Sequence, residues 1–425
     1  MFFKHKQKEL TEAPLGYWEE KSYMLAIPKN EADDLLRDSI ERISAIKNVE
    51  VIENHYSVEE NTFYVKINYE KEEYEVGFYL GDVSIPEYYL YKNFLFTDEE
   101  RKSILSSKKA ITIFMKFNEN EKKSYHLQLK LCLALVPDML GVMDESAEKM
   151  LPSKWVKMTA ESHVLPSPKN LFTVQVVAGD NKKNVWLHTH GLNRCGVTEL
   201  EILESDEKNY QNHYNLINTY AMYILDKKEE YDPNYNGAYI GCLIDESPVV
   251  ATCVSWTKGI LEYKKLDLGG LKDRENGHNS KTSIIFLYTC EEDEKSHRLK
   301  KVSIYDKLWG ENPIFFISNE ETERMKELAM ERFNYVKDAF KNKNNTILIK
   351  IGLPLEEEGK FEHIWFELLE IKGKKFKAKL TQEPYNFENI HTGYIDWYTV
   401  DDVTDWIIYT ESFAVNPGNA YLLEE

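Results

Sequence analysis

The chain has 425 residues, 42% of them hydrophobic, which is enough for two or three domains with cores of their own. Its formal net charge of −19 repels phosphate backbones, which argues against nucleic-acid binding in a basic groove and favours a basic protein as partner. No apolar run approaches the roughly 20 residues of a membrane helix and the N-terminus has no signal-peptide core, so we expect a cytoplasmic protein without a membrane partner.

The first third of the chain predicts both helices and strands. Asn30, with Asp33 three residues later, predicts the start of a helix that runs to about Ala45. Apolar alternation or continuous apolar runs predict strands at 63–69, 74–79 and 110–117. Residues 124–139 favour a helix packed on the last of these strands, and 143–151 are expected to continue it until Pro152 ends it.

The middle of the chain is expected to consist mainly of strands. These are predicted at 171–177, 184–190, 199–203, 238–244, 249–256 and 283–289. Apolar residues at helical spacing predict one long helix over 208–225. Residues 265–280 contain two adjacent glycines and several charges, so they are expected to form an exposed loop.

A domain boundary is predicted between Pro313 and Asn319. A long helix follows, capped by Ser318 or Asn319, and strands are then predicted at 346–351, 363–371, 374–380 and 393–398, with a hairpin turn at Lys372-Gly373. The fold class is therefore α+β, with mixed or antiparallel sheets and packed helices. We expect a body over 1–315, divisible into 1–165 and 166–315, and a small strand-rich C-terminal domain over 319–425 that begins with a helix.

The first candidate site is the pair His188 and His190, which lie two apart and so share one face of a strand. With Thr198 and Glu201 their spacing resembles the metal motif of JAMM-type isopeptidases, a resemblance that implies a zinc-dependent hydrolase with His188, His190 and Glu201 as ligands. In that motif a Pro, a Ser and an Asp stand where this chain has Gly191, Thr198 and Glu201. The general base would be Glu161 or a residue that the sequence does not identify.

The same segment is also consistent with a structural hairpin that binds no metal. Trp186, His188 and His190 would then face one side of a strand, and Gly191 would supply a special backbone angle at the turn. A third interpretation is a small-ligand site around Trp186 and the histidines. Trp186 and Arg194 are accordingly candidates for a binding surface.

The sequence gives no signature of nucleophilic or nucleotide-dependent catalysis. A GxSxG elbow, a Walker loop and a GxGxxG motif are all missing, and the five cysteines are scattered without a CxxC pair. Cys195, beside Arg194, is either an activated thiol or a small hydrophobic residue packed under the turn. We therefore assign no catalytic residue and no cofactor.

The C-terminal domain is rich in aromatic residues that suit either a core or a binding surface. We expect Trp365 and Trp406 to fill the core, because a small domain is short of apolar volume. Trp397 and Tyr398 are adjacent in a predicted strand and must face opposite sides, so one of them is expected at a binding surface.

Motif residues near the C-terminus and in the body resemble known families. Glu362, His363, Trp365, Pro384, Gly393, Asp405 and Trp406 resemble the pattern of a small bacterial domain, the domain of unknown function 2314. The segments LCLALVPDMLGVMDESAEKMLPSKWV and LHTHGLNRCGVTELEIL resemble the domain of unknown function 4026. The turn with Thr189, Gly191, Leu192, Glu199 and Leu200 is similar, more distantly, to suppressor-of-fused-like domains, which implies an immunity-type protein that neutralises a toxin.

Together these features predict a non-enzymatic binding protein, in an immunity-type role, that uses an acidic surface against a basic protein partner. The zinc-dependent hydrolase and the small-ligand-binding protein are the alternatives.

Overall fold

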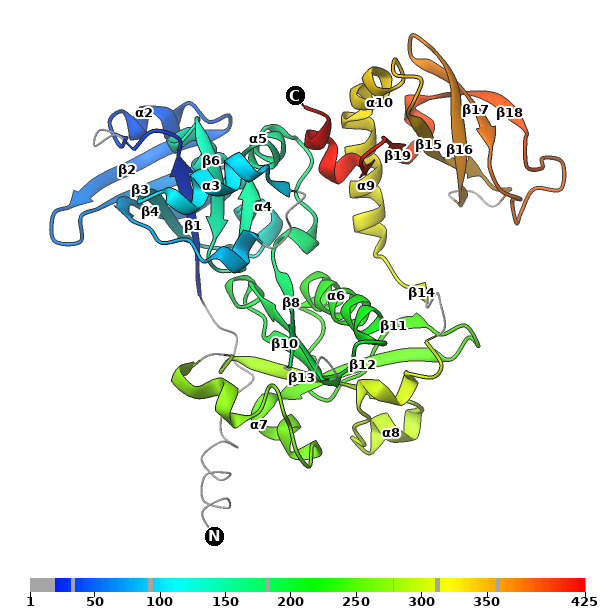
Figure 1. The fold of residues 1–425 in the computed structure, drawn as a ribbon, viewed down its shortest axis with the longest axis horizontal. Coiled ribbons are helices and arrows are strands. Elements are labelled where there is room, and N and C mark those ends of the chain that lie inside the picture. The colour runs from blue at the N-terminus through cyan, green and yellow to red at the C-terminus, as the bar shows by residue number, and fades with distance from the viewer. Residues whose placement is uncertain are drawn as a thin grey trace. The chain divides into compact units, whose positions relative to one another are not determined.

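The structure is a computed structural model that describes residues 20–31, 35–90, 95–179, 184–277, 279–309, 314–356 and 360–424. The chain forms two compact units (Figure 1). The first comprises Met1–Glu161 with Pro166–Ile317, and the second comprises Ser162–Leu165 with Ser318–Glu425. None of the helices in the described ranges has the length and apolar character needed to cross a membrane.

The first unit begins with an antiparallel seven-stranded sheet in the order β2-β3-β4-β5-β1-β6-β7. Its strands are β1 Lys21–Pro28, β2 Val49–Ser57, β3 Thr62–Tyr69, β4 Glu72–Asp82, β5 Lys109–Lys116, β6 Met139–Asp144 and β7 Lys149–Pro152. Its helices are α2 Ser39–Ser44, α3 Asp98–Ser106, α4 Glu121–Leu135 and α5 Ser153–Glu161. Side chains alternate between the two faces of β1, so Met24 packs in the core with α4, whereas Leu25 packs with Ile104 of α3.

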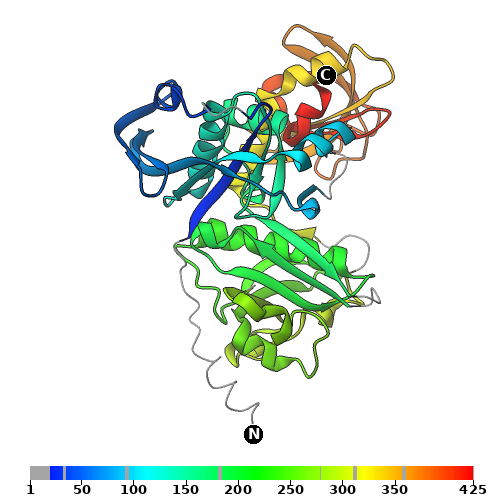
Figure 2. The same cartoon turned by 60° about the vertical axis from the view of Figure 1, so that its left-hand side comes forward.

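The second sheet of this unit has the order β14-β11-β12-β13-β10-β9-β8, and only β10 and β13 run parallel among its pairs. Its strands are β8 Thr173–Ala178, β9 Val185–His190, β10 Glu199–Ser205, β11 Ala238–Cys242, β12 Pro248–Ser255, β13 Thr282–Tyr288 and β14 Ile314–Phe315. Its helices are α6 Tyr210–Lys227, α7 Trp256–Gly259 and α8 Glu291–Lys295. The long helix α6 lies along one face of the sheet, as Figures 1 and 2 both show.

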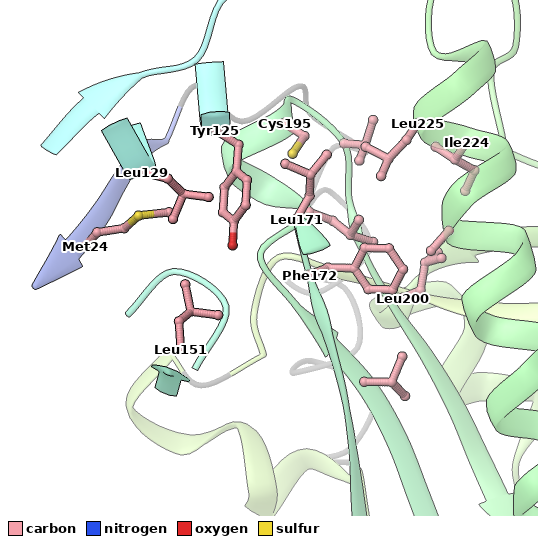
Figure 3. Close-up of a cluster of buried hydrophobic side chains, with 14 of the residues drawn as sticks. Met24, Tyr125, Leu129, Leu151, Leu171, Phe172, Cys195, Leu200, Ile224 and Leu225 are labelled. Carbon is pink, nitrogen blue, oxygen red and sulfur yellow. The ribbon is translucent and has the colours of Figure 1, made fainter. Parts of the chain in front are cut away.

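One continuous hydrophobic core joins the two sheets of the first unit (Figure 3). It extends from Met24 and Leu129 beside the first sheet, through Leu171 and Cys195, to Ile224 on α6. Because the buried apolar surface is continuous, separating the two sheets would expose it to water, and the two halves are expected to unfold together.

The second unit has a six-stranded antiparallel sheet in the order β18-β17-β16-β15-β19-β20. Its strands are β15 Thr346–Pro354, β16 Phe361–Lys372, β17 Lys375–Leu380, β18 Ile395–Thr399, β19 Val403–Tyr409 and β20 Ala414–Val415. The helices α9 Asn319–Glu331 and α10 Phe333–Ala339 cover one face, where the Phe333 and Phe376 rings lie 5.5 Å apart. Ser318 caps α9 by accepting the N–H of Glu321 at 3.2 Å.

The α+β fold class predicted from the sequence is confirmed, and most predicted strands are present. The turn at Lys372-Gly373 is also confirmed, with Gly373 at a φ of 63° that favours glycine. The prediction that residues 143–151 continue α4 is wrong. The helix ends at Leu135, just before Pro137, and β6 and β7 then pair as a hairpin whose turn contains Glu148 at a left-handed φ of 49°.

The helix expected to begin at Asn30 is much shorter than predicted. Asp38 has a left-handed φ of 59°, and the helix α2 forms only after it. Asp33 lies outside the described residues. The sequence did not predict the strands β1, β2, β6, β7, β14, β19 and β20.

Candidate functional site

The motif with the two histidines forms the adjacent antiparallel strands β9 and β10 and the turn between them. His188 lies directly opposite Glu201 in this pair. Gly191 has a φ of 112°, and a Cβ at this position would collide with the carbonyl oxygen of Leu171, so the turn requires glycine.

The buried carboxylate of Glu199 holds this turn together. One oxygen accepts the N–H groups of Gly191 and Asn193 at 2.8 and 3.0 Å, and the other accepts the hydroxyl of Thr189 at 2.6 Å. Burial raises the pKa of Glu199 to about 7, because a charged carboxylate is poorly solvated there. Glu199 therefore acts on the backbone of the turn, and its geometry indicates a structural role.

This raised pKa predicts a pH dependence of stability that Glu199→Gln removes. Between the unfolded value of 4.5 and about 7 the folded state holds a proton that the unfolded state has released, so stability falls as pH rises through this window. Relative to Glu199→Gln, the wild-type protein should lose up to about 3 kcal/mol of unfolding free energy between pH 4.5 and 7. Urea unfolding of both proteins at several pH values measures this difference, and parallel profiles would contradict the assignment.

Glu201, one of the three predicted zinc ligands, is fully buried and paired with Arg274. The guanidinium donates to both carboxylate oxygens at 2.6 and 2.7 Å, and Trp186 Nε1 donates to one of them at 2.9 Å. Thr282 also donates to this carboxylate. Arg274 lies over the ring of Trp256, 4.5 Å from its centroid. This is a desolvated bidentate ion pair enclosed by indole rings.

The two histidines lie side by side next to this ion pair. The ring of His188 is buried, 4.2 Å from that of Trp186 and 4.9 Å from that of His190. His190 Nδ1 lies 3.5 Å from Glu148 Oε1. Within the described ranges no group of three or more His, Cys, Asp or Glu side chains is placed to hold a metal ion. The zinc site stays a prediction, and a metal bound by Glu201 would have to displace Arg274.

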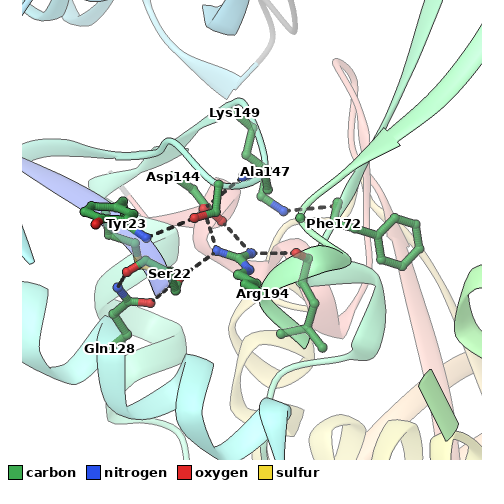
Figure 4. A network of polar contacts seen from close by, with 12 residues as sticks. Ser22, Tyr23, Gln128, Asp144, Ala147, Lys149, Phe172 and Arg194 are labelled. Atoms are coloured by element: carbon green, nitrogen blue, oxygen red, sulfur yellow. Dashed lines mark hydrogen bonds and ion pairs between the residues drawn. The ribbon is translucent and has the colours of Figure 1, made fainter. Parts of the chain in front are cut away.

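Arg194, a predicted surface candidate, forms a second buried ion pair with Asp144 of the first sheet (Figure 4). Its guanidinium donates to the two oxygens of Asp144 at 2.7 and 3.0 Å, to the hydroxyl of Ser22 at 3.1 Å and to the carbonyl of Leu171 at 2.5 Å. The turn between β9 and β10 is thereby tied to β1 and β6. Arg194 and Trp186 are both about 4% exposed, so we do not place a partner surface on either side chain.

Cys195 lies beneath the same turn and is buried. Burial raises the pKa of its thiol well above the usual value, which is the opposite of what an activated nucleophile needs. Its sulfur lies 3.7 Å from the carbonyl oxygen of Gly191. The geometry is that of a small hydrophobic residue in the core.

In the second unit Trp397 and Tyr398 face opposite sides of β18. Tyr398 packs on Phe366, with ring centroids 5.1 Å apart, whereas Trp397 is 37% exposed and Lys372 lies over its ring at 5.0 Å. Trp406 is fully buried and donates to the carbonyl of Ala329 on α9, as expected for a core residue. The same expectation is wrong for Trp365, which alternates with buried Phe366 and lies half-buried on the opposite face.

A row of aromatic side chains crosses the first sheet of the first unit on the face that α3 covers only in part. His55, Tyr64, Gly77, Phe114 and Tyr23 are register neighbours on β2, β3, β4, β5 and β1. The rings of Tyr23 and Phe114 stack at 5.5 Å, and those of His55 and Tyr64 stack at 5.2 Å. Gly77 allows this arrangement, because a Cβ there would collide with the Phe114 ring.

Exposed carboxylates lie in the next two rows of the same face, and the nearer of these rows also contains Lys66, Lys116 and Lys21. Glu53 and Glu75 lie on either side of Lys66, and Glu50 and Glu73 lie on either side of Asn68. All four glutamates are exposed or lie at the exposed rim, and Lys66 contacts Glu73 at 2.8 Å. Residues 48–82 contain nine Asp and Glu residues and two Lys residues, so this segment is strongly acidic. We call these four glutamates and the aromatic row the acidic–aromatic face.

Sequence reasoning missed this face because two of its five strands, β1 and β2, were not predicted. The dense run of four glutamates in 70–75, which also contains Tyr74, was the available signal. It becomes a surface only when the cross-strand register is known.

Comparison with protein families gives three adjacent matches. Residues 22–166 match "Protein of unknown function (DUF4026) N-terminal", and residues 174–286 match its C-terminal counterpart. Residues 317–417 match "Uncharacterized protein conserved in bacteria (DUF2314)". These matches confirm the two family resemblances stated from the sequence for the body and the C-terminal module. Neither a curated protein nor a solved structure matches the chain.

Proposed function

We propose that this chain, which carries both parts of the DUF4026 family followed by a DUF2314 module, is a non-enzymatic binding protein whose acidic–aromatic face takes a basic protein partner. The observation that carries the proposal is the position of the exposed Glu50, Glu53, Glu73 and Glu75 beside the aromatic row on one sheet face. The row is exposed at its ends, whereas Phe114 in its middle is 8% exposed and lies under Lys21. Tyr23, at the end of that row, is 36% exposed.

The two parts of the face suit different steps of protein association. Exposed carboxylates attract a basic partner over a distance and raise the rate of encounter, an effect that salt weakens. Aromatic rings on a rigid sheet supply apolar area that loses little conformational freedom on binding. A sheet face with both features supports capture of a protein better than that of a small molecule.

An immunity-type role is the specific form of this proposal. It is supported by the turn of Thr189, Gly191 and Glu199, whose residues follow the suppressor-of-fused-like pattern. The partner would then be a toxin with a basic surface that the chain neutralises by covering it.

Charge reversal on the face tests the proposal. The tagged chain should capture a basic protein from lysate at low salt, and Glu73→Lys/Glu75→Lys should reduce the captured amount about tenfold, because it replaces attraction by repulsion. Moderate salt should weaken capture by the wild-type chain in the same way.

The matched control is Glu291→Lys/Glu292→Lys, which makes the same charge change on the exposed helix α8 of the same unit. This variant should retain the partner. Equal loss in both double variants, or capture that ignores salt, would show that the acidic–aromatic face has no special part in binding.

A further inference from the structure

The second unit carries a surface of opposite charge, although the chain as a whole is strongly acidic. Five lysines lie within 372–379, and three of them, Lys375, Lys377 and Lys379, alternate along β17 with buried Phe376, Ala378 and Leu380. The buried set faces the helices α9 and α10. The lysines therefore form a straight column on the face of the sheet away from these helices.

Tryptophans lie beside this column on the same face. Trp397 of β18 is the register neighbour of Lys377, and Lys372 lies over its ring. Trp365 of β16 lies on this face too, with Lys350 5.6 Å from its ring centroid. We call Lys372, Lys375, Lys377, Lys379, Trp365 and Trp397 the lysine face.

Part of this positive charge forms no ion pair, although Glu370 is the register neighbour of Lys377 on β16. Lys379 lies 3.8 Å from Glu367 and Lys372 lies 2.8 Å from Glu370. Among the described residues no acidic side chain forms an ion pair with Lys375 or Lys377. The centre of the column is therefore available to carboxylates from outside the unit.

We propose that the lysine face binds an extended acidic polypeptide segment of a partner protein. Alternate residues of an extended chain are about 6.7 Å apart, which is also the spacing of successive lysines in the column. A segment with acidic residues at every second position would place its carboxylates against Lys375, Lys377 and Lys379 together. The indoles of Trp365 and Trp397 would contact its backbone and apolar groups on either side.

The charge around the column favours a peptide over a nucleic acid. Glu367 and Glu370 border the lysines, and they repel a polymer with a phosphate on every unit more than a peptide with a carboxylate on every second residue. A peptide would lie across the face and would not extend the sheet, because the N–H of Trp397 on the edge strand β18 donates to Asp396 at 2.7 Å. This inference concerns a different unit from the acidic–aromatic face, so either can fail alone.

Fluorescence anisotropy with the full chain and labelled probes tests the register argument. One probe is an eight-residue peptide of alternating Glu and Thr, and the second has the same composition as four Glu followed by four Thr. The alternating peptide should bind more tightly, and Lys375→Glu/Lys377→Glu should weaken its binding about tenfold. The control Lys341→Glu/Lys343→Glu makes the same charge change at exposed positions of this unit and should leave binding unchanged.

A charge-conserving variant and a nucleic-acid probe complete the test. Lys375→Arg/Lys377→Arg should retain binding, because it keeps the positive charges, and circular dichroism of each variant checks that the unit is folded. Equal affinity for the two peptides, or equal loss in the control, would overturn the proposal. Tighter binding of an eight-nucleotide oligothymidylate by the same lysines would replace the peptide with single-stranded nucleic acid.

Discussion

Replacement of Arg194 by Ala should destabilise the first unit by about 3–5 kcal/mol, one of the two largest effects expected of a single substitution in this chain. The side chains of Arg194 and Asp144 are 1% and 0% exposed, so the substitution leaves a buried carboxylate without its charge partner. It also removes the hydrogen bonds from Arg194 to Ser22 and Leu171. Calorimetry should show a melting temperature lower by roughly 10 °C.

A double variant separates loss of the charge pair from loss of packing. Arg194→Met/Asp144→Leu leaves neither charge buried alone, so it should be more stable than Arg194→Ala. If the double variant is as unstable as the sum of the two single changes, the ion pair is not what stabilises the contact between the turn and the first sheet.

Replacement of Glu201 by Ala should have a similar effect, also about 3–5 kcal/mol, because it leaves Arg274 buried without a counter-charge. Arg274 also donates to the carbonyl groups of Gly269 and Asn279, so the loss would extend to the loop that follows Asp267. Urea unfolding measures the loss. Glu201→Gln should be milder, since the amide oxygen still accepts from the guanidinium.

Metal analysis distinguishes the ion pair from the predicted zinc site. If Glu201 acts through Arg274, a chelator should leave the melting temperature of the wild-type chain unchanged, and His188→Ala should not change its metal content. Stoichiometric zinc in the purified chain, lost in His188→Ala, would instead support the hydrolase alternative.

Some parts of the fold were predicted well from the sequence. These parts depend on local patterns of apolar and polar residues. The predicted strands at 184–190 and 393–398 indicated which residues share a face, so Trp397 and Tyr398 were correctly expected on opposite sides. The prediction of a helix over 143–151 failed because the short apolar runs in this segment suit either a helix or a hairpin. The left-handed backbone of Glu148, which decides between them, leaves no mark in the residue type.

Local sequence patterns could not predict the contacts that define the sites, because these contacts join residues far apart in the chain. Arg274 pairs with Glu201 from 73 positions away, and Arg194 pairs with Asp144 from 50 positions away. The spacing of His188, His190 and Glu201 suggested a metal site because the sequence contains no sign that Arg274 pairs with the Glu201 carboxylate. The acidic–aromatic face likewise requires the register of five strands, two of which were not predicted.

Site-specific photo-crosslinking most directly tests the claim that the acidic–aromatic face binds the partner. A photoreactive amino acid at Tyr64, in the centre of the face, should capture a basic protein, and Glu73→Lys/Glu75→Lys should abolish this crosslink. The same amino acid at Leu261, which is exposed elsewhere on the unit, should capture little. A crosslink that is equally strong from Leu261, or unchanged by the charge reversal, would contradict the proposed binding surface.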